Sequence, residues 1–583
     1  MDEAARTRRG GWTTFPFIIG TMGCLTLAAG GWVANLIVYL IEEFNIKSIN
    51  AAKIYNFVNG SITLFPIVGA IIADSFVGCF SVIWFSSLIS LLGTLLLVLT
   101  AAIKHLRPPT CENGSSECKY PSHLQFAILY LGLALASLGT AGARFTIAPM
   151  GADQFDSSKH QGIFFNWYIF TMYSATVISS TAIVYVQDNV SWAWGFSLCA
   201  MANVFGLVVF LSGSRFYRIV KTQGSPFKSL AQVIVGAINK RRMVLSDKSE
   251  DYYHGLHEDR SHKTAAKIPT PFFRSAFSTS CANYELGSHK KKISMKTLTA
   301  IFYRFLNRAA LITEGDTTPG GSIAKQWKLS TVQQVDDLKS LVKIFPLWST
   351  GVFLCTPLAI QLSLAIIQAL TMDRRLHGGS HFRIPAGSMP VFILISTSVS
   401  IFIIDRLLFP LWEKLTKRPL TLLQRIGIGH ALTIISMAVS AVVELKRLNI
   451  AHSRNLQNQT NVVVPISAFW LVPQLAIAGL GEAFHFPGQV ALYYQEFPES
   501  MKSTSTAAVA MFIGIAFYIS NALIDLVRRV TGWLPDNINN GRLDNVYWLC
   551  CIVGGLNFVY YIACATLYKY QNVEEPEHDC NKS

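Results

Sequence analysis

Arg144 is an ionisable side chain inside a long apolar stretch, the run from 123 to 146. A guanidinium at membrane depth costs about 2.5–3.5 kcal/mol on insertion scales, so it should face a watery cavity, find an acidic partner or attract an anion. Its planar fork of donors suits a trigonal oxyanion better than a point-charge ammonium does. The alternative is that Arg144, close before Gly151, reaches the cytoplasmic interface as an ordinary basic anchor.

Glu482 and His485 are the other ionisable residues within an apolar run, the one from 465 to 487. They are three residues apart and so fall on one face of a helix. Glu482 has three options: to pair with His485, to pair with Arg144 across a cavity, or to stay protonated through burial. A histidine beside a carboxylate also offers a means of sensing pH. The alternative is that both residues simply pack between helices.

The composition identifies the environment that these side chains share. The chain has 583 residues, of which 51% are hydrophobic and 14% are charged, against about 25% charged in soluble proteins. Its roughly 300 apolar residues, at about 20 for each crossing, supply around twelve membrane spans. We therefore expect an all-α polytopic membrane protein.

Other classes of protein are excluded by the same residues. In a membrane protein a net charge of +15 marks cytoplasmic loops rather than nucleic-acid binding. None of the 11 cysteines falls in a CxxC or Cys/His pattern with metal spacing, so we expect no metal site and no cofactor. No nucleophile–base pair stands out in the apolar runs, which argues against an enzyme.

The apolar runs form two groups of six, separated by a polar segment in which Lys and Arg outnumber Asp and Glu. Between 213 and 343 the counts are 22 against 10, which is +12 of the net +15. Basic segments stay in the cytoplasm, and an even number of spans puts both termini on that side. The expected segments are a cytoplasmic N-terminus (1–14), a first six-helix half (15–212), a basic and partly disordered cytoplasmic linker (213–341), a second six-helix half (342–568) and a cytoplasmic tail (569–583).

Two halves of six spans around a central loop match the major facilitator architecture, in which the substrate lies at mid-membrane between the halves. Asp74 ends the second span, and Asp405 with Arg406 ends the eighth, which is the corresponding position of the other half. We expect these three residues to act as gates or as caps of cytoplasmic helix ends.

Several motifs follow one another along almost the whole chain. They are Gly-Ala-Asp-Gln-Phe-Asp at 151–156, Phe-Phe-Asn-Trp-Tyr at 164–168, Phe-Leu-Asn-Arg-Ala-Ala at 305–310, Leu-Gln-Arg-Ile-Gly-Ile-Gly at 423–429, Trp-Leu-Pro-Asp at 533–536 and Asp-Asn-Val-Tyr-Trp at 544–548. This set resembles the plant nitrate and peptide transporter family, the plant branch of the proton-coupled oligopeptide transporters. The resemblance implies the major facilitator fold and a carrier of small molecules, which in this family include nitrate, chloride, peptides, hormones and glucosinolates.

The first span departs from the family pattern. Members usually carry Glu-x-x-Glu-Arg/Lys before an Asn-Leu pair, and that set is implicated in proton coupling. Anchoring on Asn35-Leu36 places the three positions at Met22, Leu25 and Thr26, so all three charges are missing. The resemblance also places Arg144 where the family usually has a Lys that pairs with those carboxylates, so its usual partners are missing too.

Two later motifs narrow the resemblance. With the lost charges, Gly-Glu-Ala-Phe-His-Phe-Pro-Gly at 481–488 and Tyr-Gln-Glu-Phe-Pro-Glu-Ser at 494–500 are similar to the nitrate excretion transporter subgroup. The family histidine that is associated with nitrate uptake matches Leu358 here. Polar alternatives on that seventh span are Gln361 and Gln368, which can as readily bond to neighbouring helices. The candidate substrate-binding residues are Arg144, Glu482, His485, Gln361 and Asn35.

These features predict a low-affinity carrier of nitrate, with chloride as a second anion, in the plasma membrane or, alternatively, the vacuolar membrane. Moving one charge through 100 mV is worth about 2.3 kcal/mol, so an uncoupled anion equilibrates roughly fifty-fold lower inside an inside-negative cell. Without proton import, an accumulated anion flows outward. One alternative is proton-coupled uptake of a peptide, hormone or glucoside through Glu482 and His485. Another is a membrane receptor that senses nitrate and signals through the linker.

Overall fold

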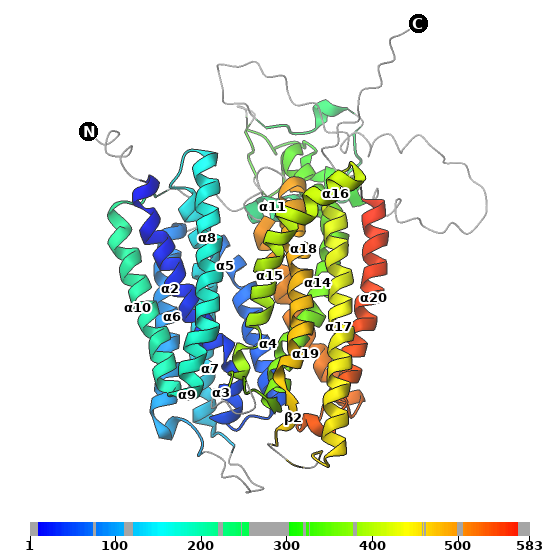
Figure 1. Cartoon of the computed structure of the whole chain (residues 1–583). Helices are drawn as coiled ribbons and strands as arrows, with labels where there is room; N and C mark the ends of the chain where they lie inside the picture. Colours follow the sequence, from blue (N-terminus) through cyan, green and yellow to red (C-terminus); the bar gives the residue numbers. More distant parts are fainter. Residues whose placement is uncertain are drawn as a thin grey trace, which may run out of the picture. The chain divides into compact units, whose positions relative to one another are not determined.

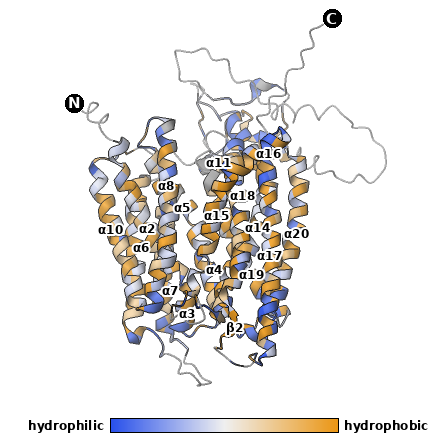
Figure 2. Ribbon diagram, viewed as in Figure 1, coloured by the Kyte–Doolittle hydropathy of each residue, from blue (hydrophilic) through white to orange (hydrophobic). Residues whose placement is uncertain are grey.

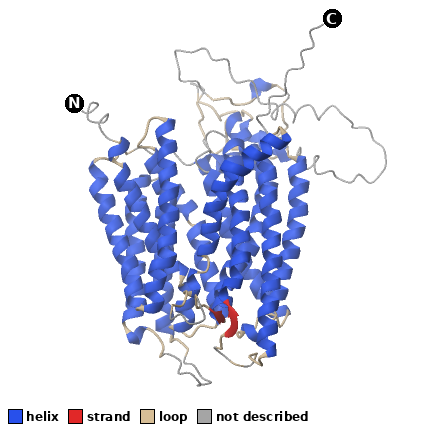
Figure 3. Cartoon of the chain, in the orientation of Figure 1, coloured by secondary structure: helices blue, strands red, loops and turns tan. Residues whose placement is uncertain are grey.

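A computed structural model shows a helical protein in which the described strands form one short pair (Figure 3). The structure describes residues 10–73, 77–109, 120–219, 226–246, 248–255, 302–318, 322–325, 327–376, 382–457, 459, 462–497 and 505–568. The chain forms two compact units. The larger lies within Met1–Thr222, Leu347–Tyr493 and Ser503–Lys569, and the smaller within Gln223–Pro346, Tyr494–Lys502 and Tyr570–Ser583.

The first half of the larger unit has six helical segments, several of them broken by a local cause. Asn35 separates the first two helices and Pro66 begins α5, as the missing proline N–H requires. A π-helical turn at Ser179–Ile183 joins α8 to α9. The helices are α2 (Phe15–Ala34), α3 (Leu36–Glu42), α4 (Ser48–Leu64), α5 (Pro66–Ile72), α6 (Gly78–Ala102), α7 (His123–Ala152), α8 (Ser158–Ile178), α9 (Val184–Asn189) and α10 (Trp192–Ser212).

The second half repeats this plan. Capping boxes at Ser122 and at Thr421 start α7 and α17, one in each half. A second π-helical turn, Ile404–Leu408, joins α15 to α16. The elements are α14 (Val332–Leu370), β1 (Met372–Asp373), α15 (Val391–Ile403), α16 (Phe409–Thr416), α17 (Leu422–Ser453), β2 (Val464–Ser467), α18 (Val472–Glu496), α19 (Ser505–Val530) and α20 (Leu543–Leu567).

Ten helical stretches of the described chain are long and apolar enough to cross a membrane. The two remaining segments, α4 with α5 and α18, carry more polar residues, and each lies beside longer apolar helices in Figure 2. Helices from distant parts of the sequence lie side by side within the larger unit, such as α2 with α10 and α17 with α20 (Figure 1).

The two halves pack directly against each other through α4 and α19. Glycines permit this approach: a Cβ on Gly60 would lie 3.3 Å from the Gly514 carbonyl oxygen, and one on Gly514 would lie 3.0 Å from the Leu64 Cβ. Polar contacts add to this packing, since Lys53 pairs with Asp525 at 2.6 Å and Asn521 donates to the Lys53 carbonyl at 2.9 Å.

Two helices extend beyond the predicted segments. Helix α14 begins at Val332, ten residues inside the predicted linker, and its residues Val335 and Leu338 are buried in the core of the smaller unit. The helical segment that starts with α15 continues to Thr416, so Asp405 and Arg406 lie in the π-helical turn inside it rather than at its end. A helix forms its backbone hydrogen bonds internally, so it can continue through polar residues beyond the end of an apolar run.

The linker contains a folded unit that its composition did not predict. Helix α11 (Pro226–Asn239) packs Val233 and Ala237 against Leu306 and Ala309. The motif at 305–310 thus supplies part of this core. The predicted disorder of the linker falls largely on 256–301, which lie outside the described residues.

A buried ion pair joins parts of the smaller unit. Lys240 Nζ lies 2.7 Å from Asp316 and donates to the Leu311 carbonyl at 2.5 Å. Burial opposes the charge of Asp316, but hydrogen bonds from Lys240 and Thr313 hold its pKa below the ordinary value.

Candidate functional site

A cavity of about 140 Å³ opens within the first half of the larger unit. Helices α2, α4, α7 and α8 supply its walls. The residues that line it are Met22, Leu25, Thr26, Ala29, Gly30, Val33, Asn59, Ile62, Thr140, Ala143, Arg144, Ile147, Tyr168, Met172 and Thr176. Arg144 is the one charged residue in that set, so the lining is apolar and hydroxylic with a single positive group.

Arg144 lies on α7, with an exposed side chain at the cavity wall. Within the described residues it forms no ion pair. The Tyr168 hydroxyl donates to the Arg144 backbone carbonyl at 3.3 Å, which holds α8 against α7 at this point. The guanidinium therefore keeps its donors available to water or to a bound anion.

The positions that lack the family charges surround Arg144. Met22, Leu25 and Thr26 all line the same cavity, and the Thr26 hydroxyl lies 3.4 Å from the Met22 sulfur. None of the lining side chains is a carboxylate. The cavity walls therefore offer neither a counter-ion for Arg144 nor a carboxyl group that exchanges a proton.

Two threonines of the lining differ in their hydrogen bonds. Thr176 donates to the Met172 carbonyl one turn earlier on its own helix, at 2.7 Å. The Thr140 hydroxyl is buried and has no hydrogen-bond partner among the described residues. Since Thr140 is one helical turn before Arg144, an unused donor and a positive charge share one face of α7.

Glu482 approaches this region from the second half. It lies on α18 and accepts a hydrogen bond from Thr397 at 3.4 Å. Tyr173 on α8 is within electrostatic range of both Glu482 and Arg144. The first-half cation and the second-half carboxylate therefore both lie near one tyrosine, and no ion pair between the two is formed among the described residues.

His485 faces elsewhere. It is buried, and its ring centroid lies 5.4 Å from that of His430 on α17. Of the three options for Glu482, the pair with His485 is therefore not formed among the described residues. Residues three apart on a helix differ by about 60° in direction, and α18 turns one toward α15 and the other toward α17 and α19.

Gln361 and Asn35 do not line the cavity. Gln361 is fully buried on α14, and its amide donates to Ser436 at 2.9 Å and to Ser440 at 2.8 Å. This geometry favours the alternative in which Gln361 bonds to a neighbouring helix. Asn35 donates to Asp188 at 2.8 Å, and Asp188 lies 3.8 Å from Arg374 of the second half. Asn35 thus belongs to a contact between the halves.

The predicted gate residues lie apart from the cavity. Asp405 and Arg406 are exposed and 3.8 Å apart, and Asp405 is also in electrostatic range of Arg425 on α17. Asp74 lies outside the described residues.

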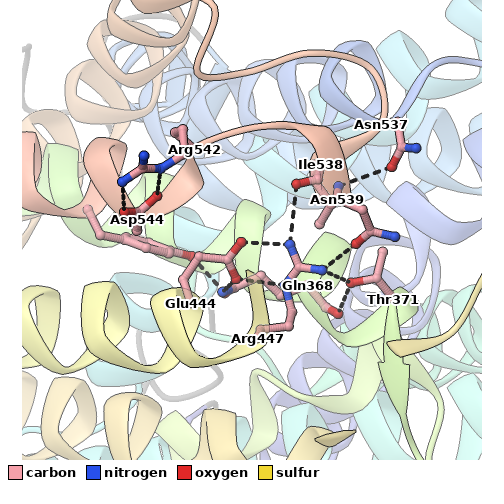
Figure 4. A network of polar contacts seen from close by, with 10 residues as sticks. Gln368, Thr371, Glu444, Arg447, Asn537, Ile538, Asn539, Arg542 and Asp544 are labelled. Carbon is pink, nitrogen blue, oxygen red and sulfur yellow. Dashed lines mark hydrogen bonds and ion pairs between the residues drawn. The ribbon is translucent and has the colours of Figure 1, made fainter. Parts of the chain in front are cut away.

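The sequence analysis missed a buried polar network in the second half (Figure 4). Arg447 and Glu444, both fully buried on α17, form a bidentate pair with bonds of 2.7 and 2.8 Å. Gln368 on α14 donates to Glu444 at 2.7 Å, and Arg447 also donates to Asn539. The signal was present, because opposite charges three residues apart on an apolar helix predict an internal pair.

A cluster of charges ties the two halves at the end of the larger unit that carries β1 and β2. Asp536 lies 2.6 Å from Lys47 and 2.6 Å from Arg528. Partial burial opposes the charge of Asp536, but hydrogen bonds from Lys47 and Arg528 hold its pKa below the ordinary value.

Two halves of membrane helices, with a cavity in the first half that has one charged lining residue, are typical of multi-pass carriers of small molecules. A profile of the POT family matches residues 80–540. Protein NRT1/PTR FAMILY 2.7 of Arabidopsis thaliana is 49% identical over 577 residues, which cover 99% of this chain and 96% of the relative. Protein NRT1/PTR FAMILY 2.6 of the same plant is 48% identical over 577 residues, with the same coverage. The chain belongs to the POT family.

Solved structures agree with this fold. A crystal structure of an auto-inhibited POT family peptide transporter superposes with a TM-score of 0.67 at 16% identity, covering 97% of this chain and 99% of that one. The POT family transporter PepTSo gives 0.66 at 18% identity, covering 95% and 98%. These matches confirm the predicted major facilitator fold, and the family consists of transporters rather than enzymes.

Proposed function

We propose that the protein carries small inorganic anions, nitrate first and chloride with it, across the plasma membrane at low affinity, and that the flow is outward. The observation that carries the proposal is the cavity in which Arg144 is the only charged lining residue. A guanidinium that forms no ion pair with any described residue keeps its donors for an anion, and hydrogen bonds between charged groups are stronger than neutral ones.

The shape of the donor set favours nitrate over chloride. Two parallel N–H groups of Arg144 match two oxygens of a trigonal ion, whereas a spherical ion uses them less well. The Thr140 hydroxyl, one turn away and without a partner among the described residues, supplies a third donor when an anion lies against Arg144.

Loose proton coupling follows from the neutral first span. Met22, Leu25 and Thr26 have no proton to exchange near neutral pH, so the voltage rather than a proton gradient drives the anion. In an inside-negative cell that voltage directs the flow outward.

The test is transport by the purified full chain in liposomes. With the voltage held at zero, a proton gradient alone should fail to concentrate nitrate, whereas an imposed voltage should drive nitrate flux. Arg144→Leu should weaken nitrate binding by about ten- to hundred-fold, the value of one charge-assisted hydrogen bond. Uphill accumulation driven by protons, or unchanged nitrate affinity in Arg144→Leu, would contradict the proposal.

A zwitterionic substrate such as a peptide, taken up with protons, is the second candidate. The observation in its favour is that Glu482 and Arg144 both lie near Tyr173, which offers one charge of each sign. Proton-driven peptide uptake that is lost in Glu482→Gln would favour this candidate over the anion carrier.

A further inference from the structure

The smaller unit presents a surface that combines exposed apolar side chains with basic ones. Ile234 and Ile238 are 44% and 47% exposed on α11, and Trp327 beside that helix is 48% exposed. The basic members are likewise exposed. We call this set the α11 surface; its residues are Ile234, Ile238, Trp327, Arg241, Arg242, Lys325 and Lys328.

Contacts within the unit bring these residues together. The Asn239 amide donates to the Trp327 carbonyl at 3.4 Å, and a Cβ on Gly236 would lie 3.3 Å from the Lys328 carbonyl oxygen. The segment that carries Trp327 therefore runs alongside the second half of α11. The opposite side of α11 is already occupied, because Val233 and Ala237 are buried in the core of the unit.

We infer that the α11 surface lies on the anionic phospholipid surface of the cytoplasmic leaflet. Isoleucines and a tryptophan beside four exposed cations form the pattern of helices that rest in a membrane interface, with apolar side chains at the acyl boundary and cations at the headgroups. The four cations are Arg241, Arg242, Lys325 and Lys328. Because these four cations attract negative charge, an anionic lipid surface fits the α11 surface better than an uncharged apolar partner does.

Chain connectivity keeps the α11 surface within reach of the bilayer. Thirteen residues, 213–225, separate the end of α10 from the start of α11, and an extended residue spans about 3.5 Å. On the other side, Leu347, where α14 joins the larger unit, follows Trp327 by twenty residues. The connections on both sides are therefore long enough for the α11 surface to bind the lipid surface next to the membrane helices.

The experiment is hydrogen–deuterium exchange of the full chain in two kinds of nanodisc, phosphatidylcholine alone and phosphatidylcholine with phosphatidylserine. Peptides that cover 230–244 should exchange about tenfold more slowly with phosphatidylserine present, since each basic residue near an anionic surface adds to the attraction. Arg241→Gln with Arg242→Gln should remove that difference, and so should Ile234→Asn with Ile238→Asn.

A matched control keeps the result specific. Ile312 is a 38% exposed isoleucine of the same unit that is not part of the α11 surface, and its backbone N–H donates to the Asp251 carbonyl. Ile312→Asn should keep the full lipid effect, and unchanged exchange of peptides over 303–311 should show that each variant is folded. Equally fast exchange of these peptides in both nanodiscs would overturn the inference. Equally slow exchange in both would overturn it too, because it would mean that the protein's own helices cover α11.

Discussion

Two arginines, one in each half of the helix bundle, have opposite surroundings. In the first half, Arg144 stands at a cavity and forms no ion pair with any described residue. In the second half, Arg447 has no exposed surface and forms a bidentate pair with Glu444, supported by Gln368 and Asn539. A guanidinium whose donors are all used stabilises a fold, whereas one whose donors are free can bind a substrate.

Two neutral polar side chains, one in each half, differ in a similar way. The Gln361 amide in the second half donates to two serines of α17 and is fully buried. Thr140 in the first half lines the cavity, and its hydroxyl has no partner among the described residues.

The largest expected effect is on stability, at Arg447. Arg447→Met leaves Glu444 charged and alone in the interior, and breaking such a buried pair costs about 3–5 kcal/mol of the free energy of unfolding. Arg144→Met should change the free energy of unfolding by less than about 0.5 kcal/mol, because no partner is lost. Thermal unfolding in detergent measures both.

A double variant sharpens that contrast. Glu444→Leu combined with Arg447→Met removes both charges and should recover most of the lost stability, since an apolar pair often replaces a buried ion pair without loss. Equal destabilisation by Arg144→Met and Arg447→Met would erase the distinction between the halves.

The next effect is on selectivity, at Arg144. Arg144→Lys keeps the positive charge but loses the planar fork, so nitrate should lose more than chloride does. We expect the preference for nitrate over chloride to fall by about tenfold, the value of roughly one charge-assisted bond. Nitrate and chloride fluxes at equal surface expression measure it. A lysine variant with unchanged selectivity would show that charge alone matters.

A smaller effect is expected at Thr140. Thr140→Val removes the unused hydroxyl at almost constant volume and should weaken nitrate binding by about three- to tenfold, the value of one hydrogen bond. Thr176→Val is the matched control, because its hydroxyl lines the same cavity but already donates to Met172. Equal affinities of the two variants would remove Thr140 from the site.

The smallest effect concerns pH at the contact between the halves. The pKa of Asp536 lies below its ordinary value, so the contribution of its bonds is present above the unfolded pKa of about 3.9 and is lost as pH falls through the folded pKa. The distance between probes near Lys47 and Asp536 should therefore be unchanged from pH 7 to about 5 and increase only below about 4. Asp536→Asn should show that larger distance at neutral pH. A separation that begins near pH 6 would point to another group.

Some of these features were predictable and others were not. The apolar runs predicted the helices because twenty apolar residues have no stable place except a membrane, and the motifs predicted the family. Helix α14 starts as early as Val332 and α16 ends as late as Thr416, which the apolar runs did not predict because helices extend past their apolar portion. The spacing of Glu482 and His485 could not reveal which neighbours each side chain would meet.

The sequence by itself determined the membrane environment, the absence of charge at Met22, Leu25 and Thr26, and the presence of one costly arginine, since all three follow from residue types and their order along the chain. Only the tertiary structure decided that Arg144 shares a cavity with those three neutral positions, that Gln361 turns into a helix contact, and that Glu444 and Arg447 satisfy each other. The reason is physical: the cost of a buried polar group depends on the atoms that surround it, and those atoms come from helices distant in sequence.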